Sequence, residues 1–249
     1  MIEELFGNIE KGELEELWPS YKSDEQKIDR FVNTNIRHAN IALNSILNEE
    51  EKECLERLFF DDTGWYKRID GDGMTKLKLA AMSLGLTNNI FTFDQKRERE
   101  MLKMASSYSR DEQLLVMRCY MKQKVVTYLT LKRYLINIKK TDLMSIELYR
   151  GIKGTYNGQK YSHNGLECWT TSIDIAERFT GGDGFVIKKS YPITQIFTGN
   201  RSTFKNRQHN IYRNNGFYVR REHEMIVENI VEEYDCTSNV YVCIDKEIF

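Results

Sequence analysis

The chain has 249 residues and a formal net charge of -1; 41% of the residues are hydrophobic, 29% charged and 12% aromatic. This length is enough for one large domain or two ordinary ones with a buried core, and the near-zero charge excludes any inference about partners from the whole chain. No apolar run approaches the roughly 20 residues of a membrane span, and the acidic start, Met1 to Leu5, lacks the pattern of a signal peptide. We therefore expect a cytoplasmic location, in the producing or in a target cell, and no membrane partner.

Residues 1–142 are predicted to form a helical module, because their apolar residues recur with helical spacing. Ser23-x-x-Gln26 has the pattern of a capping box. The apolar residues that follow it share one helical face and are expected to form a single helix: Ile28, Phe31, Val32, Ile36, Ala39, Leu43 and Ile46.

Four further helical segments are predicted in this module. One begins at Asn48-x-x-Glu51, a second covers Leu77–Leu84 and stops at Gly85, a third begins at Ser109-x-x-Glu112, and a fourth covers Leu131–Ile138. No linker rich in Gly, Ser and Pro follows them, so we expect the module to pack against the rest of the chain.

Residues 143–249 are predicted to form an α+β domain with mainly antiparallel strands. Its short runs are rich in β-branched and aromatic residues: Ile146–Tyr149, Leu166–Thr171, Phe185–Ser190, Ile193–Phe197, Glu222–Val231 and Val240–Ile244. Gly- and Asn-rich loops separate the runs, and one short helix is expected over Asp174–Phe179.

Several sequence features resemble parts of metal or phosphate sites, but none completes the motif that such a site requires. The five cysteines form no Cys-x-x-Cys pair, which favours reduced, structural thiols, and the four histidines form no His-Glu-x-x-His motif. Asp70–Gly73 does not fit a calcium loop, since Arg68 and Leu79 fall at ligand positions, and is expected to be a surface turn. Gly181–Gly184 lacks the spacing of a phosphate-binding loop and is expected to be a plain loop. No metal is therefore expected.

Three short elements in the second half combine into a candidate catalytic site. The first is Leu148-Tyr149-Arg150-Gly151, with an arginine at the end of a strand. The second is Trp169-Thr170-Thr171-Ser172, with hydroxyls between a strand and a helix. The third is Glu222-His223-Glu224, with two carboxylates at the mouth of a strand.

Each element also has a purely structural explanation. Residues i and i+2 of a strand face the same side, so Glu222 and Glu224 project together, an arrangement that costs stability unless it serves a purpose. Structurally, they would pair with Arg220 and Arg221. Arg150 would form a surface ion pair, and Ser172 would cap the following helix.

At these residues the sequence resembles the R-S-E class of mono-ADP-ribosyltransferases. This class includes clostridial binary toxins, Rho-modifying exoenzymes, vertebrate arginine-specific transferases and phage-encoded modifiers. The arginine, the hydroxyl run and the Glu-x-Glu pair occur in the family's order, and the resemblance covers residues 146–249. Thr170 departs from the family, which usually has serine there. The resemblance implies an ADP-ribosyltransferase fold with a split antiparallel β core.

The resemblance also implies roles for the site residues, with NAD as the co-substrate. Arg150 would hold the phosphates of NAD, and the backbone at Gly151 would lie against the nicotinamide amide. Thr170 would contact the nicotinamide ribose, while Thr171 and Ser172 shape the cleft. Glu224 would stabilise the oxocarbenium charge that develops as the nicotinamide–ribose bond breaks. Glu222 would orient or deprotonate the acceptor.

The acceptor itself is left open by the sequence. In the family, Glu at the position of Glu222 accompanies arginine acceptors, so a protein arginine is the first expectation. However, residues 184–221 are free of acidic residues and interleave basic with aromatic side chains, which suits nucleic acid. Candidate contacts there are Arg201, Phe204, Lys205, Arg207 and Tyr212, and residues 122–140 form a second basic stretch. The blander explanation is that the basic residues bind the phosphates of NAD.

The expected function is therefore transfer of ADP-ribose from NAD to a macromolecule, in a toxin, phage-defence or phage-modifier role. The alternatives are modification of RNA or DNA bases, plain NAD hydrolysis, and a non-catalytic binding module that keeps the fold. If the protein acts in its own cell, an antitoxin or another regulator is expected, with the helical module as a candidate docking surface.

Overall fold

A computed structural model describes residues 2–7, 9–60, 72–86, 95–154, 161–162, 166–199, 224–228, 233–234 and 240–242. The α-helices are α1 (Ile2–Phe6), α2 (Lys11–Leu17), α3 (Tyr21–Thr34), α4 (Ala39–Ile46), α5 (Glu49–Phe60), α6 (Asp72–Ser83), α7 (Gln95–Ala105), α8 (Arg110–Tyr134) and α9 (Ile173–Arg178). The strands are β1 (Ser145–Ile152), β2 (Tyr161–Ser162), β3 (Leu166–Thr170), β4 (Phe185–Pro192), β5 (Ile196–Gly199), β6 (Glu224–Glu228), β7 (Glu233–Tyr234) and β8 (Val240–Val242).

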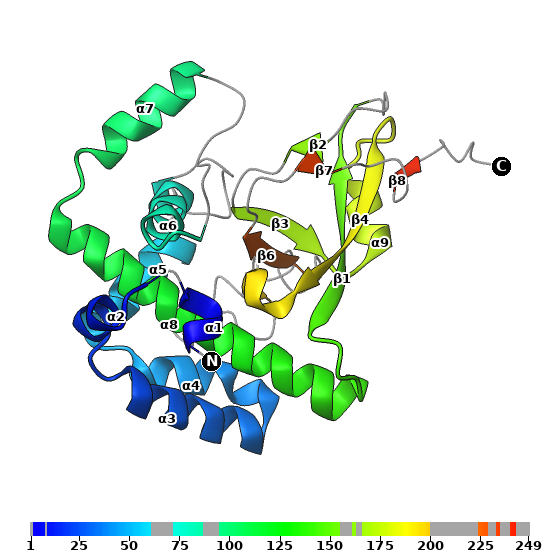
Figure 1. Ribbon diagram of the computed structural model, residues 1–249. Coiled ribbons are helices and arrows are strands. Elements are labelled where there is room, and N and C mark those ends of the chain that lie inside the picture. The colour runs from blue at the N-terminus through cyan, green and yellow to red at the C-terminus, as the bar shows by residue number, and fades with distance from the viewer. Residues whose placement is uncertain are drawn as a thin grey trace.

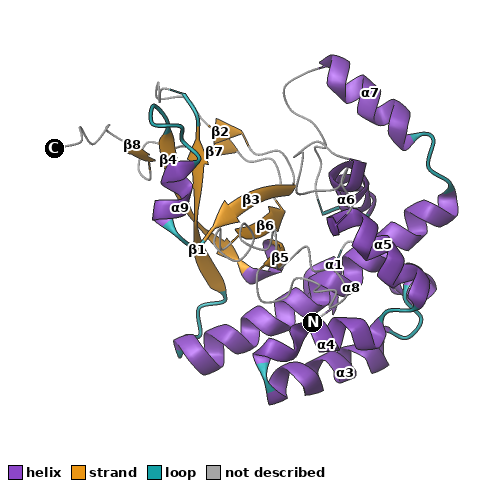
Figure 2. Ribbon diagram, turned by 180° about the vertical axis from the view of Figure 1, so that it is seen from behind, coloured by secondary structure: helices purple, strands orange, loops and turns teal. Residues whose placement is uncertain are grey.

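Helices fill the first part of the chain, and strands dominate the second, as Figures 1 and 2 show. The larger sheet is antiparallel, with the strand order β5-β6-β3-β1-β4-β8, and β2 pairs with β7 in a small second sheet. The predicted mixture of helices and antiparallel strands is thus confirmed. None of the helices within the described ranges combines the length and apolar character needed to cross a membrane.

Helix α8 is the central element of the fold and is buried on all sides between Cys119 and Leu131. It runs below the sheet in the view of Figure 1 and packs against β5, with α3, α4, α5 and α6 beside it. The ring of Tyr120 stacks on that of Phe197 from β5, with centroids 4.4 Å apart and nearly parallel planes. One hydrophobic core therefore includes residues of both parts, and the expected packing between them is confirmed.

The predicted division at residues 142 and 143 falls in a short connection between these parts. A single turn of π-helix (Leu135–Lys139) extends α8, and Lys140 then adopts a left-handed conformation with φ of 54°. The first strand begins at Ser145.

Local sequence signals located two helix starts correctly. The Asn48 side chain accepts a hydrogen bond from the Glu51 N–H at 2.8 Å, and Glu51 accepts one from the Asn48 N–H at 2.9 Å, which completes a capping box. The Ser109 hydroxyl accepts from the Glu112 N–H at 3.2 Å. The predicted stop at Gly85 is also confirmed, because its φ of 68° suits a helix end.

Other helix predictions were wrong. The capping box at Ser23 does not form, because α3 already begins at Tyr21 and the Ser23 hydroxyl donates to the Ser20 carbonyl. The expected single helix through Ile46 is broken at the extended residue Asn35. Leu131–Ile138 is not a separate segment but continues α8, since no Gly or Pro interrupts that run.

The predicted surface turn at Asp70–Gly73 is wrong in its second half, because α6 begins at Asp72; residues 70 and 71 lie outside the described part of the chain. The loop expected at Gly181–Gly184 is confirmed as a turn between α9 and β4. The run Ile193–Phe197 divides into a 3-10 turn (Ile193–Gln195) and the start of β5.

A buried ion pair joins α5 to α8. The Lys122 ammonium lies 2.7 Å from both oxygens of Glu51, whose side chain is only 2% exposed. The same ammonium donates to the Ile46 carbonyl at the end of α4 at 3.0 Å, and it lies 5.7 Å from the centre of the Trp18 ring. Lys122 therefore connects four segments of the helical part.

Lys124 is buried two residues further along α8. Its ammonium lies 5.5 Å from the centre of the Phe6 ring in α1, and burial lowers the pKa of Lys124 to about 7. Neither Lys122 nor Lys124 belongs to an exposed basic surface, which corrects the interpretation of residues 122–140 as a stretch open to nucleic acid.

Glu51→Ala is expected to lower the free energy of unfolding by about 3–5 kcal/mol, because it removes one of the two capping-box hydrogen bonds and leaves the Lys122 charge buried without its carboxylate. Urea unfolding measures the loss. Glu49→Ala is the matched control, since Glu49 is 91% exposed and pairs with Lys52 on the same helix; its effect should stay below about 1 kcal/mol. Similar losses for both variants would contradict the importance of the buried pair.

Lys124→Met should change how stability depends on pH. The folded pKa of about 7 lies below the unfolded value of about 10.4, so between these values the unfolded wild type binds a proton that the folded state lacks. The free energy of unfolding of the wild type should therefore rise with pH across this window. At about 1.4 kcal/mol per pKa unit, the rise between pH 7 and pH 10 should be on the order of 3 kcal/mol. The variant should lack this rise, whereas a variant of the exposed Lys103 should retain it. Urea unfolding at pH 7 and pH 10 tests this.

Candidate active site

The three sequence elements lie on three neighbouring strands of the larger sheet. Arg150 and Gly151 belong to β1, Thr170 is the last residue of β3, and Glu224 is the first residue of β6. In the antiparallel ladders, Tyr149 lies opposite Thr170, and Thr170 lies opposite Glu224. Because directly opposed Cα atoms are about 4.5–5.5 Å apart, Tyr149, Thr170 and Glu224 form one row across the sheet. Arg150 is the next residue of β1, so its side chain projects to the opposite face from that of Tyr149.

The Arg150 guanidinium lies between β1 and β3. One terminal nitrogen donates to the Cys168 carbonyl at 2.7 Å, and the other lies 3.9 Å from a carboxylate oxygen of Glu167. The Arg150 side chain is 21% exposed and that of Glu167 only 2%. This arrangement differs from the surface ion pair that was the structural alternative. The strand also continues to Ile152, so the expectation that it ends at Arg150 was wrong.

Gly151 lets α9 approach β1 closely. A Cβ atom built at Gly151 would lie 1.9 Å from the Ala176 carbonyl oxygen and 3.1 Å from Cβ of Phe179. Because the first of these contacts is to backbone, it cannot be relieved by a side-chain rotation. The glycine after Arg150 is therefore required by the packing of α9, whatever further role it has toward a ligand.

The hydroxyl run connects β3 to α9 as predicted. Thr170 is buried, and its hydroxyl accepts a hydrogen bond from the Ser172 N–H at 3.2 Å. Ser172 occupies the N-cap position of α9, but its side chain forms no cap hydrogen bond. The structural explanation of Ser172 as a helix cap is therefore wrong.

A polar network lies on β1 and β4 beside this row. Lys188 is the register partner of Tyr149, and its ammonium lies 2.5 Å from a carboxylate oxygen of Glu147. The Tyr149 hydroxyl donates to the other oxygen of Glu147. The hydrogen bonds from Lys188 and then from Tyr149 hold the pKa of Glu147 below its usual value.

Several predicted site residues lie outside the described residues. They are Glu222 and the candidate acceptor contacts Arg201, Phe204, Lys205, Arg207 and Tyr212. Across the ranges that the structure does describe, no three His, Cys, Asp or Glu side chains come close enough together to hold a metal ion.

Two features of the site were not predicted from the sequence: the position of Glu167 beside Arg150, and the pairing of Tyr149 with Thr170 across β1 and β3. Glu167 had a visible signal, because it is the one charged residue among the apolar and aromatic residues of Leu166–Trp169. A charge in such a strand is buried only when it has a partner, and here Arg150 lies beside it. The position of Tyr149 had no such signal, since it depends on strand pairing.

Comparisons with models of protein families, with curated proteins and with solved structures gave no match to this chain. The arrangement of the site residues is therefore the basis on which a function can be argued.

Gly151→Ala is expected to lower the free energy of unfolding by at least about 2 kcal/mol, because the new methyl group would overlap the Ala176 carbonyl and force α9 away from β1. Gly12→Ala is the matched control. Gly12 lies in α2, and a Cβ atom added there would meet no other atom within 4 Å, so alanine should raise stability by about 0.5–1 kcal/mol. Thermal unfolding of both variants measures the difference, and a neutral Gly151→Ala would contradict the close approach of α9.

Proposed function

We propose that the chain is a mono-ADP-ribosyltransferase, which transfers ADP-ribose from NAD to a macromolecule. The observation that carries this proposal is the row formed by β1, β3 and β6. Arg150, Thr170 and Glu224 are far apart in sequence, yet the register brings their backbones to neighbouring strands. One residue from each motif thus lies on a set of three adjacent strands.

Two further observations support the proposal over the structural explanations. The Arg150 guanidinium is half-buried and hydrogen-bonded to strand β3, so it is oriented rather than mobile at the surface. The Ser172 hydroxyl is not used to cap α9. Neither side chain therefore forms the particular contact, a surface ion pair or a cap hydrogen bond, that the sequence suggested as its structural role.

In the proposed reaction, the bond between the nicotinamide nitrogen and the ribose breaks, and nicotinamide leaves with the electron pair. Glu224 stabilises the positive charge that develops on the ribose. The acceptor nucleophile then forms a bond to the anomeric carbon and loses its proton to Glu222. Arg150 holds the NAD phosphates with its planar guanidinium, and Thr170 contacts the nicotinamide ribose.

A protein arginine remains the first proposed acceptor, as Glu at position 222 suggests. A nucleic-acid acceptor is less favoured than the sequence suggested, because Lys122 and Lys124 are buried in α8. Labelled NAD incubated with a cell extract and the protein distinguishes the two acceptors. Removal of the label by protease supports a protein acceptor, whereas removal by nuclease supports RNA or DNA. NAD turnover without any labelled macromolecule would instead indicate an NAD glycohydrolase.

Glu224→Gln should lose transfer and NAD hydrolysis together, by at least about a hundredfold, because the neutral amide does not stabilise the developing charge. Glu228→Gln is the matched control at the other end of β6, opposite Leu166, and should retain activity.

Glu222→Ala should lose transfer but keep slow NAD hydrolysis, since water needs less orientation than a macromolecule. Release of nicotinamide and label transfer are both measured on folded protein.

Near-normal NAD turnover in Glu224→Gln would remove this residue from the mechanism. Absence of NAD turnover and of label transfer in the wild type would favour a non-catalytic binding module.

A further inference from the structure

A pair of cysteines lies at the contact between α5 and α8, away from the candidate active site. Cys54 lies in α5 and Cys119 in α8, where these two helices pack together, and both are free thiols. Cys119 is fully buried, and its sulfur lies 3.5 Å from the Glu51 carbonyl oxygen. Cys54 is only partly buried. Cys54 lies one turn after Glu51 in α5, and Cys119 lies one turn before Lys122 in α8, so the two cysteines occupy neighbouring turns at this helix contact.

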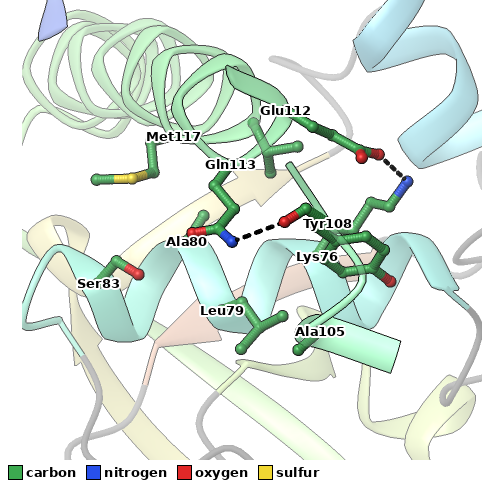
Figure 3. A pocket seen from close by; sticks show the side chains of 10 residues that line it. Lys76, Leu79, Ala80, Ser83, Ala105, Tyr108, Glu112, Gln113 and Met117 are labelled. Atoms are coloured by element: carbon green, nitrogen blue, oxygen red, sulfur yellow. Dashed lines mark hydrogen bonds and ion pairs between the residues drawn. The ribbon is translucent and has the colours of Figure 1, made fainter. Parts of the chain in front are cut away.

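Cys54 opens onto a cavity of about 390 Å³ between α5, α6 and α8. Basic side chains from two helices, Arg57 and Lys76, line it, together with Glu50, Glu53 and Glu112. Lys76 lies 2.7 Å from a carboxylate oxygen of Glu112 and 4.8 Å from the centre of the Tyr108 ring, and Figure 3 shows both residues beside it. One thiol of the pair is therefore accessible to a small reagent through a charged cavity, while the other is not.

The surroundings give the two thiols different chemistry. The neighbouring Cys119 thiol, and then the charges of Lys76 and Arg57, lower the pKa of Cys54, against the opposing effects of burial and of Glu112. The neighbouring Cys54 thiol, together with burial, raises the pKa of Cys119 well above its ordinary value. Since the thiolate is the reactive form of cysteine, the accessible Cys54 is the nucleophile of the pair, and Cys119 remains a thiol beside it.

We propose that Cys54 and Cys119 form a modification site for small hydroperoxides, at which the pair is oxidised to a disulfide that links α5 to α8. The Cys54 thiolate attacks one peroxide oxygen, the O–O bond breaks, and Cys54 becomes a sulfenic acid as the first water is released. The Cys119 sulfur then attacks the Cys54 sulfur, the S–O bond breaks, and the Cys119 proton leaves with the hydroxide as a second water. Two thiols and one hydrogen peroxide thus give one disulfide and two waters.

The test uses the folded chain of 249 residues and hydrogen peroxide. After brief exposure, remaining thiols are blocked with N-ethylmaleimide, and the unreduced protein is digested and analysed by mass spectrometry. The expected product is a peptide pair linked through Cys54 and Cys119 that disappears on reduction. Cys54 should also react with iodoacetamide at least about tenfold faster than Cys168, the other partly buried cysteine of the described residues.

Three variants separate the steps. Cys119→Ser should trap Cys54 as a sulfenic acid that reacts with dimedone, whereas Cys54→Ser should leave Cys119 unoxidised. Cys168→Ser is the control and should still form the linked pair. Circular dichroism establishes that each variant is folded. Linkage of Cys54 to a cysteine other than Cys119, or equal alkylation rates for Cys54 and Cys168 in the wild type, would overturn the proposal. Because no NAD is present, failure here is independent of the proposed transferase activity.

Discussion

The ion pair between Glu51 and Lys122 organises the helical part of the molecule. Glu51 caps the start of α5 and at the same time meets the ammonium of Lys122 on α8. Since Lys122 also donates to the end of α4 and lies against Trp18, its position is determined from several sides. Burial of two charges is costly unless their geometry and hydrogen bonds are good, so this contact tolerates little displacement of either helix. The facing cysteines one turn away depend on the same alignment.

Sequence patterns predicted the features that local chemistry controls. Asn48 and Glu51 satisfy each other's backbone within four residues, and Gly85 ends a helix because it adopts positive φ. Runs rich in β-branched and aromatic residues indicated most strands to within a few residues. The position of the hydroxyl run between β3 and α9 could be predicted for the same reason.

The features that were missed depend on contacts between distant segments. The sequence placed Lys122 and Lys124 in a basic stretch that suits phosphate contacts. In the structure α8 is surrounded by other elements, and both lysines are buried. The partnership of Arg150 with Glu167 and Cys168 follows from strand pairing, which no short pattern specifies. Gly151 was noted for its backbone, yet the constraint on it comes from α9. The sequence therefore indicated the candidate residues Arg150, Thr170 and Glu224, but only the strand register shows that they lie on adjacent strands.

The stack of Tyr120 on Phe197 has a consequence for how this chain can be divided. The rings come from the two predicted parts, and the apolar residues around them belong to one core. A fragment beginning at residue 143 would expose the face of β5 that packs against α8, including Ile196 and Phe197, both of which are buried in the intact chain. The strand-rich part is thus not an exchangeable module. If the strand-rich part were joined to a different helical module, that module would need an apolar surface to cover β5 in place of α8.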